Sequence, residues 1–158
     1  MRSPIMRVRS IHVVLVLATV LLLCPMAPAA IAQSVGVRAG VSVDPEQFYF
    51  GGHAETPPLA DRLRFRPSVE IGLGDDTTVG AFNVEFAYHF RSAEPWNLYA
   101  GAGPALNIIK RGRDTDAEPG INLLVGVAHE DGLFAEFKVG ALDSPRVKFG
   151  VGYAMRWR

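Results

Sequence analysis

The chain has 158 residues, a length that suits a single domain. Its formal net charge is zero, with 16 Lys and Arg residues against 16 Asp and Glu residues. Neither end carries a charged tail of the kind that binds nucleic acid. The single cysteine, Cys24, excludes a fold that is held together by internal disulfides.

The first 32 residues predict a secretory signal peptide. A basic start with three arginines precedes the apolar run 13–23, and Ala30 and Ala32 place small residues at the two positions that signal peptidase reads. The apolar run of about 11 residues is shorter than the ~20 residues of a membrane-spanning helix, which argues against an uncleaved anchor. We expect cleavage after Ala32, which leaves residues 33–158 with a formal net charge of minus three.

The rest of the chain alternates apolar and polar residues with a period of two, the pattern of β-strands. Residues 34–43 (SVGVRAGVSV) alternate without error. Residues 62–74 (RLRFRPSVEIGLG) put leucine, phenylalanine, valine and isoleucine on one face, and three arginines and a glutamate on the other. The same criterion predicts eight strands, at residues 34–43, 47–54, 62–74, 79–91, 96–109, 120–129, 133–141 and 147–158.

Most of the predicted connections are short and rich in turn-forming residues. The longest and most charged connection is expected at residues 110–119. Pro67 and Pro104 fall within predicted strands, and proline cannot donate to the hydrogen-bond ladder. We therefore expect a β-bulge at each of these prolines.

Strands that are joined by tight turns pair as antiparallel neighbours. Every predicted strand has one apolar and one polar face, and no second layer of structure is encoded to cover the apolar side. Closing the sheet removes its edges. The predicted fold class is therefore all-β, an eight-stranded antiparallel up-and-down barrel formed by residues 33–158.

Such a barrel can place its apolar face inside, as in a lipocalin-like carrier, or outside against lipid. Glycine dominates the polar face, where it would leave room for long side chains in a narrow lumen. The predicted strands also match the ~9–11 residues that a tilted strand needs to cross a bilayer. Outward aromatic residues would gather at the edge near the termini, as a membrane-interface girdle does; they are Tyr88, Phe90, Trp96 and Trp157. These features favour a transmembrane barrel.

A signal peptide followed by eight glycine-rich, aromatic-ended strands resembles the small outer-membrane β-barrel proteins of Gram-negative bacteria (OmpA/OmpX-like). The resemblance implies a monomer in the outer membrane with both termini in the periplasm. It also implies contact with outer-membrane lipids, lipopolysaccharide and the barrel-assembly machinery, without a cofactor. The chain departs from the family in ending on Arg158 after Trp157, and its short outer loops do not fit an OmpX-like adhesive surface.

The inward face of this barrel would carry a network of charged side chains. Its members are Arg38, Arg64, Arg66, Lys138 and Lys148 with Glu70, Glu85 and Glu136. An eight-stranded barrel is too narrow for a water channel. We interpret the network as a salt-bridged filling of the lumen; the alternative is an anion path or a switchable gate.

The expected function is a structural or surface-interaction role in the outer membrane. The alternatives are an outer-membrane lipid-modifying enzyme and an exported lipocalin-like carrier. His53 and His89 would point inward, whereas Asp75 and Asp76 would lie at the opposite edge, so a catalytic triad is geometrically poor. No metal-ligand spacing appears. Acidic residues in the outer loops could bind divalent cations that bridge lipopolysaccharide, although solvated loop carboxylates are the simpler interpretation.

Overall fold

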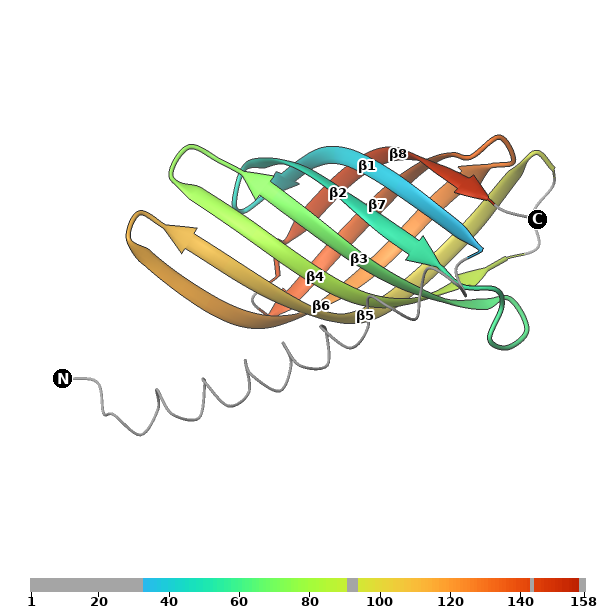
Figure 1. The fold of residues 1–158 in the computed structure, drawn as a ribbon, viewed down its shortest axis with the longest axis horizontal. Helices are drawn as coiled ribbons and strands as arrows, with labels where there is room; N and C mark the ends of the chain where they lie inside the picture. Colours follow the sequence, from blue (N-terminus) through green and yellow to red (C-terminus); the bar gives the residue numbers. More distant parts are fainter. Residues whose placement is uncertain (1–32, 91–93, 143, 157–158) are drawn as a thin grey trace. The chain divides into compact units, whose positions relative to one another are not determined.

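The computed structural model describes residues 33–90, 94–142 and 144–156. These residues form a closed barrel of eight antiparallel strands, in which neighbours along the chain pair and β1 also pairs with β8 (Figure 1). The strands are β1 (Ser34–Val43), β2 (Gln47–Glu55), β3 (Leu63–Leu73), β4 (Thr77–His89), β5 (Trp96–Arg111), β6 (Asp114–His129), β7 (Leu133–Leu142) and β8 (Val147–Arg156). The predicted fold class is confirmed. The predicted signal peptide, with Ala30 and Ala32, lies outside the described residues.

The two ends of the barrel differ in their connections. At the terminal end, where β1 begins and β8 ends, residues 56–62 join β2 to β3. At the opposite, distal end, residues 44–46 join β1 to β2, and residues 112–113 join β5 to β6. The distal end therefore has short turns. None of the described residues belongs to a helix long and apolar enough to span a membrane.

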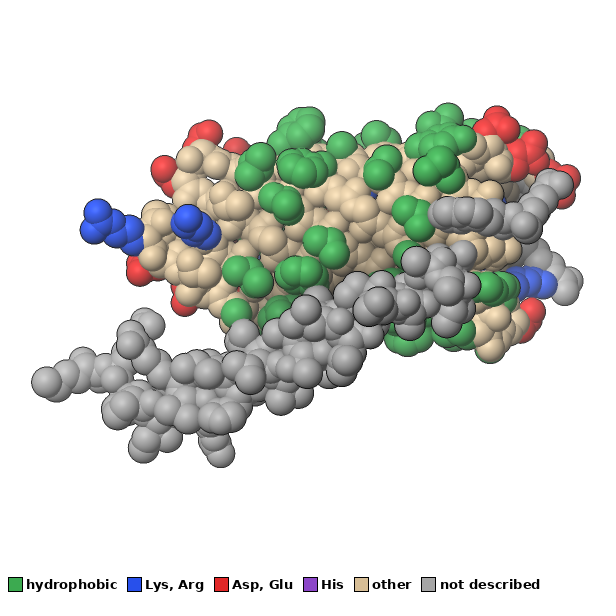
Figure 2. Space-filling view, viewed as in Figure 1, with side chains coloured by type: hydrophobic (Ala, Val, Ile, Leu, Met, Phe, Trp, Pro, Cys, Tyr) green, Lys and Arg blue, Asp and Glu red, His purple; other side chains and the backbone are tan. Residues whose placement is uncertain are grey.

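The apolar face of every strand points outward. Val37 and Phe48 are each 65% exposed, whereas Arg66, Glu70 and Glu85 on the inward face are at most 2% exposed. Figure 2 shows hydrophobic side chains spread over the visible outer wall. The prediction of an apolar exterior is confirmed, and the interior contradicts the alternative of a lipocalin-like carrier because charged side chains fill the lumen.

The prediction of a long loop at residues 110–119 is wrong. β5 and β6 continue as a paired hairpin with a two-residue turn, in which Gly112 adopts a positive φ of 59°. Pairing of β5 with β4 extends as far as Arg111, so the ladder supports a segment whose charged composition resembles a loop. Pairing of β6 with β7 begins only at Gly120, so residues 114–119 form a free edge of the sheet.

The predicted bulges at Pro67 and Pro104 are also absent. Pro67 pairs with Val84 in an uninterrupted β3–β4 ladder, and Pro104 pairs with Ile121 in an uninterrupted β5–β6 ladder. On the other side of each proline the ladder is interrupted and then resumes in the same register. The missing donors are therefore accommodated by a local gap in pairing, without an extra residue.

Glycines on the inward face make room for large side chains, as expected. A side chain at Gly126 would collide with the ring of Tyr99, and one at Gly150 would collide with the hydroxyl group of Tyr49. Both tyrosines are almost fully buried. Tyr99 comes from the strand paired with that of Gly126, and Tyr49 lies two strands away from Gly150, so the glycines make room for side chains of nearby strands.

Candidate functional site

The middle of the lumen is built around Glu70 of β3. Its Oε1 atom lies 3.0 Å from Nη2 of Arg38 and 3.0 Å from Nζ of Lys138. Its Oε2 atom accepts a hydrogen bond of 2.7 Å from Lys148. Three cations from β1, β7 and β8 therefore converge on one carboxylate.

Glu136 of β7 is a second centre of the same network. Its Oε1 atom lies 2.5 Å from Nη1 of Arg38, and its Oε2 atom lies 2.5 Å from Nη1 of Arg66. The hydroxyl group of Tyr99 donates a hydrogen bond of 2.8 Å to Oε2. Since Arg38 contacts both Glu70 and Glu136, the two centres form one continuous system.

Lys138 extends this system to β4 through an ion pair of 2.6 Å with Glu85. The lumen network now contains Arg38, Arg66, Lys138 and Lys148 with Glu70, Glu85 and Glu136, and all seven residues are at most 5% exposed. A fourth buried carboxylate, that of Glu55, lies 3.9 Å from Nε of Arg66, so four carboxylates face these four cations. Removing one partner from such a cluster leaves uncompensated buried charge, which is strongly unfavourable.

Sequence reasoning missed one carboxylate of the lumen, Glu55. The predicted strand at residues 47–54 ends one residue before it. In the structure β2 includes Glu55, whose Oε1 atom lies 2.9 Å from Nη1 of Arg64. The signal was present, since Glu55 continues the inward alternation of Tyr49 and His53. Arg64 lies closer to the barrel mouth than Arg66, and its side chain is 20% exposed.

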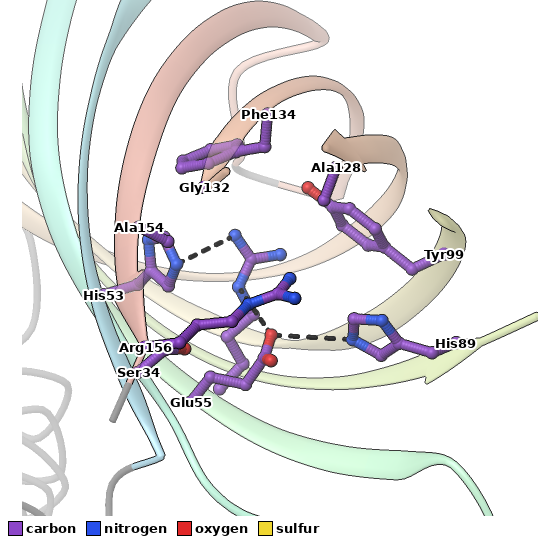
Figure 3. A pocket seen from close by; sticks show the side chains of 11 residues that line it. Ser34, His53, Glu55, His89, Tyr99, Ala128, Gly132, Phe134, Ala154 and Arg156 are labelled. Carbon is purple, nitrogen blue, oxygen red and sulfur yellow. Dashed lines mark hydrogen bonds and ion pairs between the residues drawn. The ribbon is translucent and has the colours of Figure 1, made fainter. Parts of the chain in front are cut away.

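A small cavity lies at the terminal end of the lumen (Figure 3). Its volume is about 20 Å³, and its lining includes Ser34, His53, Glu55 and His89. Figure 3 shows the two histidines on opposite sides of the cavity, with Glu55 between them. A polar space of this size holds about one water molecule.

The hydrogen bonds of His89 define its orientation. The Asn97 side-chain amide donates to the carbonyl oxygen of Phe90 at 3.3 Å, so its Oδ1 atom is the acceptor that faces Nδ1 of His89 at 2.9 Å. Nε2 of His89 then points to Glu55 Oε2 at a distance of 3.6 Å. The ring also stacks on Tyr99, with centroids 5.3 Å apart.

This geometry does not assemble a catalytic triad. Among the described residues, no hydrogen bond joins Ser34 to His53 or His89, and the cavity has no room for a lipid substrate. His129 pairs with Asp131 in the β6–β7 region at 3.2 Å. Within the described part of the chain, no group of three or more His, Cys, Asp or Glu side chains is arranged to hold a metal ion.

The predicted aromatic residues lie on the outer wall near the terminal end. Tyr88, Phe90 and Trp96 are 37%, 41% and 49% exposed. The rings of Tyr88 and Phe90 contact edge to face, with centroids 5.3 Å apart. Phe65 and Phe86 extend this cluster, with centroids 5.5 Å apart. Trp157, the fourth predicted residue, lies outside the described residues.

The fold and the lumen define a class of proteins, the eight-stranded meander barrels with a polar interior and an apolar outer wall. Among solved structures, the chain is similar to Neisserial surface protein A (NspA), with a TM-score of 0.62 and 15% identity over 78% of this chain and 95% of that chain. It is also similar to the N-terminal β-barrel domain of Pseudomonas aeruginosa OprF, with a TM-score of 0.55 and 17% identity over 79% of this chain and 99% of that domain. At these identities the likeness shows a shared fold.

No protein-family model matches the chain, and no curated protein matches its sequence.

Proposed function

We propose that the protein is an integral outer-membrane barrel with a structural or surface-interaction role. The observation that carries this proposal is that apolar side chains cover the outside of the barrel and charged side chains fill the inside. A soluble protein has the reverse arrangement. Leu123 and Val125 are at least 50% exposed, while Glu70 and Lys138 are 1% exposed. A continuous apolar exterior of this kind requires lipid, because monomeric soluble proteins rarely expose large apolar patches.

The height of the apolar belt supports the same conclusion. On β5, the outward residues from Leu98 to Ile108 are apolar. Ten residues that rise ~3.3 Å each along a strand tilted by roughly 40° cover about 25 Å along the membrane normal. This height equals that of the apolar band of outer-membrane barrels, about 25 Å.

The proposed orientation places the terminal end in the periplasm and the distal end at the cell surface. The predicted leader supports export, and the aromatic cluster that contains Tyr88 and Trp96 marks the membrane interface at the terminal end. The distal turns are short and offer too little surface for a large adhesive contact. Outer-membrane lipids and lipopolysaccharide are therefore the expected partners, and the barrel functions as a monomer.

The ion network supports a closed lumen rather than a pore. Glu70 and Glu136 each join cations from different strands across the interior. Opening a path would separate these buried pairs, and each separated pair leaves charges that are costly in a low-dielectric interior. We therefore assign the network a structural role and no role in transport.

The test is to fractionate cells that express the full chain and to examine the protein on a gel with and without heating. The proposal predicts that the protein co-sediments with the outer membrane and migrates as a compact species until it is boiled. Recovery in the soluble periplasm, without a heat-dependent shift, would contradict it. Planar bilayers that contain the purified protein should show no steady conductance.

A further inference from the structure

A row of three polar side chains crosses the outward face at the distal end. Lys110 of β5 pairs directly with Thr78 of β4 on one side and with Thr115 of β6 on the other. Directly opposite residues in antiparallel strands project to the same face, with Cβ atoms about 5 Å apart. Thr78 and Thr115 therefore flank the base of the Lys110 side chain on the outer wall.

Lys110 is unusual among the cations of the barrel. Within the strands that the structure describes, it is the one Lys or Arg on the outward face, and among the described residues it has no ion-pair partner. The other strand cations belong to the lumen or to its two mouths. An outward cation on a wall of apolar residues needs an anionic partner or water at the same height.

The height of Lys110 coincides with that of lipid headgroups. It is the next outward residue after Ile108, which ends the apolar belt on β5. One further outward position adds about 5 Å along the membrane normal, beyond the ~25 Å of hydrocarbon. The ammonium group and the two hydroxyl groups therefore meet the phosphate layer of a bilayer.

The extended β5–β6 hairpin also separates charge by face. Asp116 and Glu118 pair with Ile109 and Asn107, which are buried on the inward face, so these carboxylates face the mouth of the barrel. Arg113 lies in the turn of the same hairpin. Beyond the apolar belt, the paired outward positions of the hairpin therefore carry no carboxylate, and Lys110 is their one charged residue. Figure 2 shows both basic and acidic side chains at the distal end, beyond the apolar belt.

We propose that Thr78, Lys110 and Thr115 form a seat for a phosphate group of an outer-leaflet lipid headgroup. This inference rests on the proposed function, which places the distal end at the cell surface. There the phosphorylated lipid is the lipid A part of lipopolysaccharide. The ammonium group supplies the charge, the two hydroxyl groups donate hydrogen bonds to phosphate oxygens, and the apolar wall below contacts the acyl chains.

The test is to titrate the folded, detergent-solubilised full chain with lipid A and to count bound lipids by native mass spectrometry. Lys110→Gln should weaken binding about fivefold, the effect of losing one lysine at an anionic membrane surface. Lys110→Arg should restore it. Arg146→Gln is the matched control, because Arg146 is another cation at the distal end but pairs with Asp44 at 3.1 Å; it should bind as the unaltered protein does.

Two further ligands identify what is recognised. Lipid A from which the phosphate groups have been removed should bind the unaltered protein and Lys110→Gln equally. Phosphatidylglycerol should bind more weakly than lipid A and with less dependence on Lys110. Equal binding of lipid A by Lys110→Gln and the unaltered protein would overturn the inference. The inference would also be overturned if phosphatidylglycerol bound as tightly as lipid A and with the same dependence on Lys110.

These outcomes differ from a failure of the proposed function. Each variant is first checked for the heat-dependent gel shift, which reports a folded barrel independently of lipid A binding. A protein that inserts into the outer membrane but binds lipid A without dependence on Lys110 would retain the proposed function and refute the phosphate seat. A protein found in the soluble periplasm would refute both.

Discussion

Glu70 is the residue on which the charge balance of the lumen depends most. It is 1% exposed and contacts Arg38, Lys138 and Lys148. Its strand neighbours Val69 and Ile71 point to the opposite, outward face. A change at Glu70 therefore alters the buried network without altering the lipid-facing wall.

Glu70→Gln should destabilise the barrel by about 3–5 kcal/mol, because three buried cations lose their shared carboxylate. The measurement is the free energy of unfolding in urea, with the protein folded in detergent micelles. Asp61→Asn serves as the control, since the Asp61 side chain is 86% exposed and its contact with Arg62 is long, at 3.8 Å. Equal stability of Glu70→Gln and the unaltered protein would mean that the network does not hold the lumen together.

Single residues also show where sequence reasoning reached its limit. Alternation placed Arg38, Arg66 and Glu136 on the inward face, but pairing across the barrel depends on the stagger of eight strands and could not be read from one strand. Phe134 and Leu124 were not expected in the lumen, yet they are 6% and 2% exposed. They pack with Tyr99 in a small apolar cluster that a strict polar-inside pattern does not predict.

At the level of elements, β4 and β5 come so close together at Gly103 that only a glycine fits there. A Cβ atom at Gly103 would collide with the carbonyl oxygen of Val84. The ladder between β4 and β5 is interrupted beside this position, and register resumes at Phe86 and Ala102. The missing side chain lets the two strands stay together where Pro104 removes a donor.

Gly103→Ala should therefore destabilise the barrel by about 1–3 kcal/mol, the usual cost of forcing extra atoms into a packed region. Gly80→Ala on the same strand pair is the matched control, since its nearest contact, the Ile108 carbonyl oxygen, lies 4.0 Å away. Both variants are compared by urea unfolding in micelles. Equal stability of the two would contradict the close approach of β4 and β5 at Gly103.

The β5–β6 hairpin shows why an element can be misread. Residues 114–119 have no large apolar residue on their outward face, which carries Thr115, Ala117 and Pro119. Their strand conformation comes from pairing with β5, which itself pairs with β4 as far as Arg111. Composition predicts burial well, but it does not reveal a hydrogen-bond ladder that continues into polar surroundings.

For the whole molecule, alternation and turn residues were sufficient to predict the number of strands, their antiparallel order and the outward apolar face. This worked because a barrel wall repeats one physical demand along every strand: apolar residues outside and polar residues inside. The limits of β3 and β4 were predicted within two residues. The contacts that fill the lumen required the closed structure.

Val69→Arg should block or strongly impair insertion, since Val69 is 48% exposed on the outer wall of β3. Arginine on the lipid face costs about 2–4 kcal/mol near the midplane of the membrane. Leu59→Arg is the control, because Leu59 is 59% exposed in the connection between β2 and β3. The readout is the amount of heat-modifiable protein in the outer membrane. Normal assembly of Val69→Arg would argue against a lipid-facing outer wall.

The most direct test of the central claim is a spin-label scan along β6. The chain's one cysteine, Cys24, lies in the predicted leader, so single cysteines placed at residues 121–126 of the barrel can be labelled selectively once the leader is removed. In reconstituted membranes, collisions with lipid-soluble oxygen should peak at Ile121, Leu123 and Val125 and fall at Asn122 and Leu124. Peaks at residues 122 and 124, or no alternation along the strand, would contradict a barrel with an apolar exterior in lipid and a charged interior.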